Sequence, residues 1–109
     1  MRKILLSVTA AMLLTACSVT APVRGSMEDG SETFAGTATG YADATGTMSI
    51  SSNRGLSCVG SLAYVNARQG TGTFNCSDGR SGPFQFTGNG QRGHGVGRLG
   101  NQRFTFTFG

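Results

Sequence analysis

GHGVGRLGNQRFTFTFG, residues 93–109, is the stretch that decides the fold. Glycines stand at alternate positions before a Gly100-Asn101 turn, and phenylalanines stand at alternate positions after it. Side chains on a strand alternate between its two faces, and a two-residue turn returns the chain antiparallel. The expected pairs are Gly93 with Phe108, Gly95 with Phe106 and Gly97 with Phe104. The stretch therefore predicts a hairpin in which each ring lies over the space left by a glycine.

The same alternation extends back along the chain to Phe34, with a turn signal between each pair of strands. A glycine-ended loop at 53–55 predicts that Ile50 lies opposite Cys58, and a turn at 66–68 then places Cys58 opposite Cys76. A third turn at 77–79 predicts that Phe84 lies opposite Gly72. These registers put the large and the smallest side chains on one common face.

Two further turns complete the expected register. Asn89-Gly90 is typical of a two-residue hairpin turn and predicts that Phe84 lies opposite Gly95 and Phe86 opposite Gly93. A turn near residues 41–43 would set Gly36 beside Met48 and Phe34 beside Ile50. Pro83 falls inside an expected strand where it cannot donate a hydrogen bond, so we expect a bulge or a changed register near it.

The pattern predicts an all-β domain over residues 33–109, an antiparallel meander of about seven short strands. Threonine and serine fill the face opposite the rings, which indicates that this face meets water. A strongly curled sheet or small closed barrel would bury the rings as a core. An open sheet would need a partner or a second copy to cover them. A membrane-spanning barrel is a third arrangement, although its strands would have to be longer and its outer face apolar.

The N-terminal segment carries a targeting pattern. A basic start, Met1-Arg2-Lys3, precedes a mostly apolar stretch over residues 4–14, which is typical of a secretory signal and too short for a membrane span. The Leu14-Thr15-Ala16-Cys17 motif that follows resembles the lipobox of bacterial lipoproteins. The resemblance implies cleavage after residue 16 and lipid attachment, including a fatty acid such as palmitate, at Cys17. Ser18 implies an outer-membrane destination, with the periplasmic or surface side left open. An ordinary secretory signal is the alternative.

Residues 17–32 contain Pro22, Gly25 and Gly30 among small polar residues, and we interpret them as a flexible tether. Beyond this tether only Cys58 and Cys76 remain as cysteines. Because an exported chain meets an oxidising compartment, and because the turn at 66–68 places these cysteines opposite each other, we predict a Cys58–Cys76 disulfide.

The hairpins recur at roughly regular spacing along the chain. The unit from Phe84 to Phe106, FQFTGNGQRGHGVGRLGNQRFTF, resembles MORN repeats, with glycines and an aromatic at the positions that pattern uses. The resemblance implies repeated hairpin units with this glycine and aromatic spacing.

Candidate chemistry is sparse in this composition. His94 is the only histidine and falls on the polar face, and Asp78 next to Gly79 is typical of a turn. No motif for a nucleophile, a paired acid and base, a metal or a nucleotide is present, so we expect no enzyme, no metal and no cofactor. Arginines in or beside the turns are candidate contacts for an anionic partner, with solubility as the alternative role. They are Arg54, Arg68, Arg80, Arg92, Arg98 and Arg103.

These observations favour a non-enzymatic lipoprotein of the cell envelope, anchored in the outer membrane through the lipid on Cys17. We expect its β domain to bind another envelope component, either a protein or an anionic glycan or lipid, and not nucleic acid. Self-association is expected if the sheet is open. A structural or surface-coat role without a specific ligand is one alternative, and a small inhibitor of an exported hydrolase is another.

Overall fold

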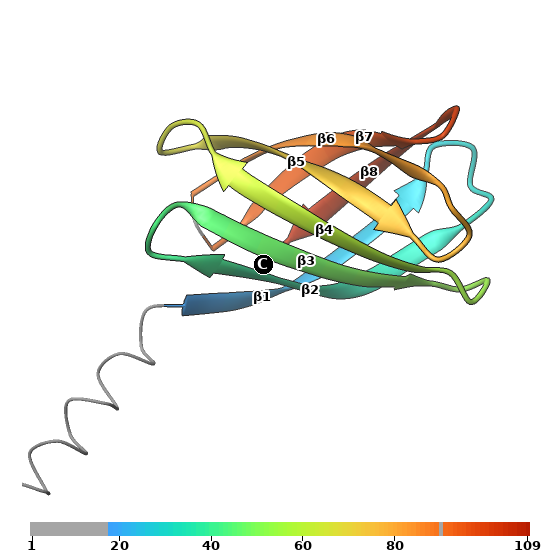
Figure 1. The fold of residues 1–109 in the computed structure, drawn as a ribbon, viewed down its shortest axis with the longest axis horizontal. Helices are drawn as coiled ribbons and strands as arrows, with labels where there is room; N and C mark the ends of the chain where they lie inside the picture. The colour runs from blue at the N-terminus through green and yellow to red at the C-terminus, as the bar shows by residue number, and fades with distance from the viewer. Residues whose placement is uncertain (1–17, 90) are drawn as a thin grey trace, which may run out of the picture.

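The structure, a computed structural model, describes residues 18–89 and 91–109 and shows a closed barrel of eight antiparallel strands (Figure 1). The strands pair in chain order, and the last closes the barrel against the first. The predicted all-β meander and its closure are confirmed, with one strand more than expected. The strands are β1 (Ser18–Met27), β2 (Thr33–Tyr41), β3 (Thr45–Ser52), β4 (Ser57–Tyr64), β5 (Gln69–Cys76), β6 (Ser81–Gly88), β7 (Gly93–Leu99) and β8 (Gln102–Phe108).

The additional strand, β1, comes from the segment that we interpreted as a flexible tether, and that interpretation is wrong. Residues 18–27 pair with β2 along almost their whole length, and residues 23–27 also pair with β8. Val23 and Met27 are almost completely buried, at 2% and 1% exposure. Without β1 the seven other strands would leave two edges and expose the rings, so this segment is what closes the barrel.

Four of the predicted registers are confirmed. Ile50 lies opposite Cys58, Cys58 lies opposite Cys76, and Phe84 lies opposite Gly72. The last hairpin also has the predicted pairs, including Gly95 with Phe106. Each of these turns fixes its register through a few local residues, which is why the sequence pattern was sufficient.

Two predicted registers are wrong, each by two residues. Phe84 lies opposite Gly97 and Phe86 opposite Gly95, because the side chain of Asn89 accepts hydrogen bonds from the N–H groups of Gln91 and Arg92 and lengthens the loop. Gly90 lies outside the described residues.

Between β2 and β3, Gly36 lies opposite Ile50 and Phe34 opposite Ser52. The turn there is centred on Asp43, whose carboxylate accepts hydrogen bonds from the N–H and hydroxyl of Thr45. A shift of two residues leaves every side chain on its original face, so the residues predicted to face the interior are the same after both corrections.

Pro83 causes no bulge, contrary to our expectation. It pairs with Thr73 of β5 in an unbroken register and is exposed on the outer wall. The pairs between β6 and β7 begin at Phe84, immediately after the proline. The missing N–H of Pro83 therefore interrupts none of these pairs.

The interior is built from large side chains that lie over glycines of the preceding strand. A Cβ atom added to any of these glycines would meet the large side chain of its partner. The glycines thus provide the space that lets a narrow barrel enclose so many rings. The pairs are Gly46 with Leu62, Gly60 with Phe74, Gly72 with Phe84, Gly70 with Phe86, Gly97 with Phe104, Gly95 with Phe106, and Gly93 with Phe108.

The rings pack into one continuous core in the middle of the barrel. Phe74 is fully buried, with its ring centroid 4.6 Å from that of Phe84 and 5.6 Å from that of Phe104. The predicted Cys58–Cys76 disulfide is present and joins β4 to β5. Threonines and serines occupy the outer wall as predicted, for example Thr71, Thr73, Thr105 and Thr107.

Candidate functional site: the open mouth of the barrel

The two ends of the barrel differ, and the candidate site lies at the end where β1 begins. We call this end the mouth; it carries residue 18, the loops at 42–44 and 65–68, residues 89, 91 and 92, and the end of β8. The opposite end, which we call the closed end, carries the turns at 28–32, 53–56, 77–80 and 100–101. In Figure 1 the mouth is on the left and the closed end on the right.

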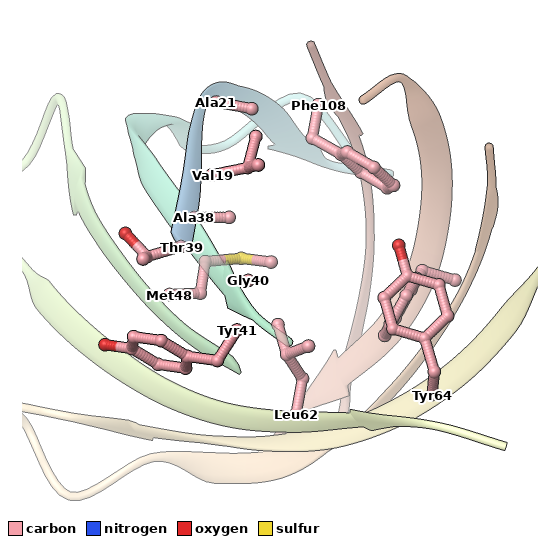
Figure 2. Close-up of a pocket in the computed structure, with 11 residues that line it drawn as sticks. Val19, Ala21, Ala38, Thr39, Gly40, Tyr41, Met48, Leu62, Tyr64 and Phe108 are labelled. Atoms are coloured by element: carbon pink, nitrogen blue, oxygen red, sulfur yellow. The ribbon is translucent and has the colours of Figure 1, made fainter. Parts of the chain in front are cut away.

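A cavity of about 190 Å³ opens at the mouth (Figure 2). Met48 and Ala38 border it from one side, and Tyr64 and Phe108 border it from the other. Ligand pockets are typically about 300–1,000 Å³, so this cavity fits a small apolar group or the end of a chain rather than a whole drug-sized molecule. Its lining residues are Val19, Ala21, Ala38, Thr39, Gly40, Tyr41, Met48, Leu62, Tyr64, Phe86 and Phe108.

The cavity exists because the alternation of large side chains and glycines fails at this point. Gly40 lies opposite Val19 on one side and Gly46 on the other, so no ring covers it. A Cβ atom added at Gly40 would have no neighbour within 4 Å, and the residue needs no left-handed backbone. The next inward positions on β1 and β2 are Ala21 and Ala38, which are also small. Together these residues leave unfilled space inside the barrel wall.

Unequal strand lengths keep this space open. The pairs between β1 and β8 begin at Val23, whereas β1 continues to Ser18 with β2 as its partner. The first five residues of β1 therefore extend past the end of β8 and form one lip of the mouth. Pro22 lies at the base of this lip, where its carbonyl oxygen accepts a hydrogen bond from the N–H of Gly109 at 2.9 Å. Its missing N–H reduces pairing with other strands at this edge.

All eleven lining residues are uncharged, and the Tyr64 side chain brings a hydroxyl to the inner face. The hydroxyl of Thr39 is instead hydrogen-bonded to that of Thr20 at 3.0 Å on the outer wall. The Tyr64 ring meets Phe86 edge to face, with centroids 5.0 Å apart and planes at 89°. Phe86 in turn meets Phe108 at 5.9 Å. The packed rings of Tyr64, Phe86 and Phe108 form one wall of the cavity, with the Tyr64 hydroxyl near the opening. Such a wall suits a ligand that is apolar with one polar end.

The closed end is sealed by packing and by an ion pair. Leu56 and Leu99 are buried there, and Glu32 is only 5% exposed. A guanidinium nitrogen of Arg80 donates to Glu32 at 2.9 Å, and a second donates to Asp78 at 2.7 Å. The hydrogen bond from Arg80, opposed by burial, holds the pKa of Glu32 below its usual range. The pair thus covers the core without leaving a buried charge unpartnered.

The six predicted arginines do not form one patch. Arg54 and Arg80 lie in turns of the closed end, and Arg98 and Arg103 face each other near it across β7 and β8. Arg68 and Arg92 lie in loops of the mouth. Arg80 donates to Glu32, Asp78 and Gln102, so its guanidinium is engaged inside the protein and is a structural group.

The other candidate residues from the sequence lie at ordinary surface and turn positions. His94 is exposed on the outer wall of β7, and the carboxylate of Asp78 accepts from the N–H of Arg80 as a turn residue does. Within residues 18–89 and 91–109, no cluster of three or more metal-ligating side chains occurs. The same described residues include no helix long and apolar enough to cross a membrane. The predicted signal segment and Cys17 lie outside the described residues.

Sequence reasoning missed both features that distinguish the ends. The signal for the cavity was a pair of small residues at consecutive inward positions of β2, Ala38 and Gly40. The predicted register between β2 and β3 was wrong by two residues, so the prediction did not place Gly40 opposite Gly46. The pairing of Glu32 with Arg80 had no sequence signal, because the residues are 48 positions apart and belong to different turns.

Comparison with known proteins identifies the fold. No protein family matches the sequence, and no curated protein does. Two designed proteins have a similar structure. The redesigned β-barrel mFAP1, solved with bound DFHBI, has 12% identity and a TM-score of 0.63, covering 82% of this chain and 90% of that one. A de novo designed fluorescence-activating β-barrel has 14% identity and a TM-score of 0.62, covering 82% of this chain and 88% of that one. At these identities the likeness shows a shared barrel fold.

Proposed function

We propose that this protein is a non-enzymatic lipoprotein of the cell envelope that holds a small apolar group in the mouth of its barrel. Anchoring in the outer membrane through Cys17 follows from the lipobox resemblance. The observation that carries the binding role is the cavity itself, which is lined mainly by apolar side chains and opens at the mouth. The ligand class that fits is the apolar end of an envelope lipid or a similar amphiphile.

The chemistry of the lining narrows this class. The uncharged wall favours an apolar group, and the hydroxyl of Tyr64 can hydrogen-bond to a polar end near the opening. The mFAP1 barrel was solved with DFHBI bound, which is a precedent for a small molecule held by a barrel of this kind. The predicted anionic partner is compatible with this proposal when the anion is the headgroup of a lipid, because Arg68 and Arg92 lie at the same end.

Binding is tested by filling the cavity. Calorimetric titration of the mature chain with octanoate and with octanol should give saturable binding at one site. Gly40→Leu places a side chain in open space and should abolish that binding without disturbing the fold. Thr37→Leu adds the same side chain to the exposed face of the same strand and should bind as the unchanged chain does. Equal binding by both variants, or no saturable binding to the unchanged chain, would reject the cavity as a ligand site.

Anchoring is tested separately. A Cys17→Ser variant expressed with labelled palmitate should lose the label and leave the membrane fraction, while Ser18→Ala should retain both. If Cys17→Ser stays in the membrane fraction although it carries no label, the lipoprotein proposal is wrong. If anchoring holds and the cavity binds neither probe, the surface-coat role becomes the better account.

A further inference from the structure

The position of β1 fixes how far the barrel can lie from its anchor. The first described residue, Ser18, already belongs to β1 and pairs with Tyr41 at the rim of the mouth. The predicted lipid attachment at Cys17 is the residue immediately before it. No tether therefore separates the anchor from the barrel wall at the mouth. The closed end is farther from the anchor, because the ten residues of β1 span about 33 Å at the usual rise per residue.

Exposed apolar side chains gather at this same end. Val19, Tyr41 and Val65 are 53%, 47% and 67% exposed, and all three lie on the rim of the mouth. The two other large hydrophobic residues exposed in the described part of the chain, Val59 and Val96, stand singly on the outer wall of β4 and β7. Single apolar residues on a wall are ordinary, but three of them beside one opening indicate a surface that something covers.

Charge also distinguishes the ends. Four of the five acidic residues of the chain lie in turns of the closed end, where Arg54 and Arg80 offset only two of them; the four are Glu28, Asp29, Glu32 and Asp78. The loops of the mouth hold Arg68 and Arg92 against the single acid Asp43, and Asp43 is held by Thr45. An anionic surface would therefore attract the mouth more strongly than the closed end.

We infer that the mouth of the barrel is seated on the surface of an anionic lipid bilayer, with the rim formed by Val19, Tyr41 and Val65 in the interfacial region. Tyrosine is enriched at such interfaces because its ring is apolar and its hydroxyl stays hydrated. In this orientation the cavity opens toward the acyl chains, so its ligand enters from the bilayer. The inference rests on the proposed anchoring at Cys17.

Depth-dependent quenching tests the orientation, because the chain contains no tryptophan and a single one can be introduced as a reporter. The lipidated chain carrying Tyr41→Trp at the mouth, or Asn101→Trp in the exposed turn of the closed end, is reconstituted into vesicles that contain an anionic lipid and brominated acyl chains. Tyr41→Trp should show a blue shift and loss of fluorescence, and Asn101→Trp should show neither. Equal quenching of both reporters, or quenching of Asn101→Trp alone, would overturn the inference.

A matched pair of variants shows whether the rim causes the orientation. In the Tyr41→Trp background, Val65→Ser should reduce quenching, whereas Val59→Ser removes a valine of similar exposure from the wall and should not. If neither change matters, the rim is not the contact. Co-sedimentation of the same vesicles separates the two proposals. A chain that sediments with vesicles while Tyr41→Trp stays unquenched retains its anchor and refutes the docking, whereas a chain that does not sediment refutes the anchor as well.

Discussion

The two ends of the barrel are built from the same hairpins, yet one is sealed and the other is open. At the closed end Leu56 and Leu99 fill the interior, and the Arg80–Glu32 pair covers them. At the mouth the corresponding inward positions hold Gly40, Gly46 and Ala38, and β1 extends past β8. The difference shows that a uniform repeat of glycines and rings specifies the wall, while a few residues at each end decide whether the barrel encloses a core or a binding space.

The largest expected effect contrasts a glycine under a ring with a glycine at the cavity. A Cβ atom at Gly95 would overlap the ring of Phe106 and lie 2.6 Å from the carbonyl oxygen of Gln85, so Gly95→Val should destabilise by about 3 kcal/mol. Gly40→Leu, which meets open space, should change stability by less than about 0.5 kcal/mol. Urea denaturation of both variants measures the contrast. Similar losses at the two positions would show that the mouth is packed like the middle of the barrel.

The second effect concerns the ion pair that seals the closed end. Glu32→Gln should destabilise by about 2 kcal/mol at neutral pH, because it weakens a charged hydrogen bond to Arg80. Since folding lowers the pKa of Glu32, this stabilisation is complete above the unfolded value of about 4.3 and is lost as the pH falls through the lower folded pKa. The difference in unfolding free energy between the parent chain and Glu32→Gln should therefore become smaller at acidic pH.

An exposed ion pair at the same end is the control for that experiment. Glu28 lies 3.3 Å from Arg103, with both side chains more than half exposed. Glu28→Gln should lower the free energy of unfolding by less than about 0.5 kcal/mol. Denaturation midpoints of both variants across neutral and acidic pH measure the comparison, and a Glu28→Gln loss as large as that of Glu32→Gln would contradict the burial argument.

A third effect, smaller than that of Glu32→Gln, lies in the turn at the mouth. Ala44 has a backbone φ of 70°, in the left-handed region that costs a residue with a Cβ about 1 kcal/mol. Ala44→Gly should therefore raise the melting temperature by several degrees. Ala35→Gly, within β2 on the exposed face, should lower it instead. Thermal denaturation followed by circular dichroism distinguishes them, and a shift of the same sign in both would disprove strain at Ala44.

The segment over residues 18–27 shows where sequence patterns mislead. Val19, Ala21, Val23 and Met27 do alternate on one face, as a strand requires, with Gly25 completing the series. Pro22 and Gly25 resemble linker residues, however, and both are tolerated in β1 for reasons that only neighbours explain. Pro22 lies on the overhang beyond β8, and Gly25 lets the backbone of Phe106 approach closely.

The candidate site was predictable only in part. Turn positions correctly placed the arginines at the ends of strands, but no sequence pattern could show that Arg80 is engaged by Glu32 or that four of the six lie at or near the closed end. The Cys58–Cys76 disulfide was predictable because one short turn determines it. The cavity depended on which residues lie opposite Gly40, and that register was wrong by two.

The sequence by itself determined that this chain forms antiparallel hairpins with rings on one face and hydroxyls on the other, because a period of two residues and local turn chemistry act within each hairpin. Only the tertiary structure decided that β1 closes the barrel against β8, and that one end is sealed while the other is open. Those outcomes depend on contacts between residues far apart in the chain, such as Val23 with Phe108, which no local pattern specifies.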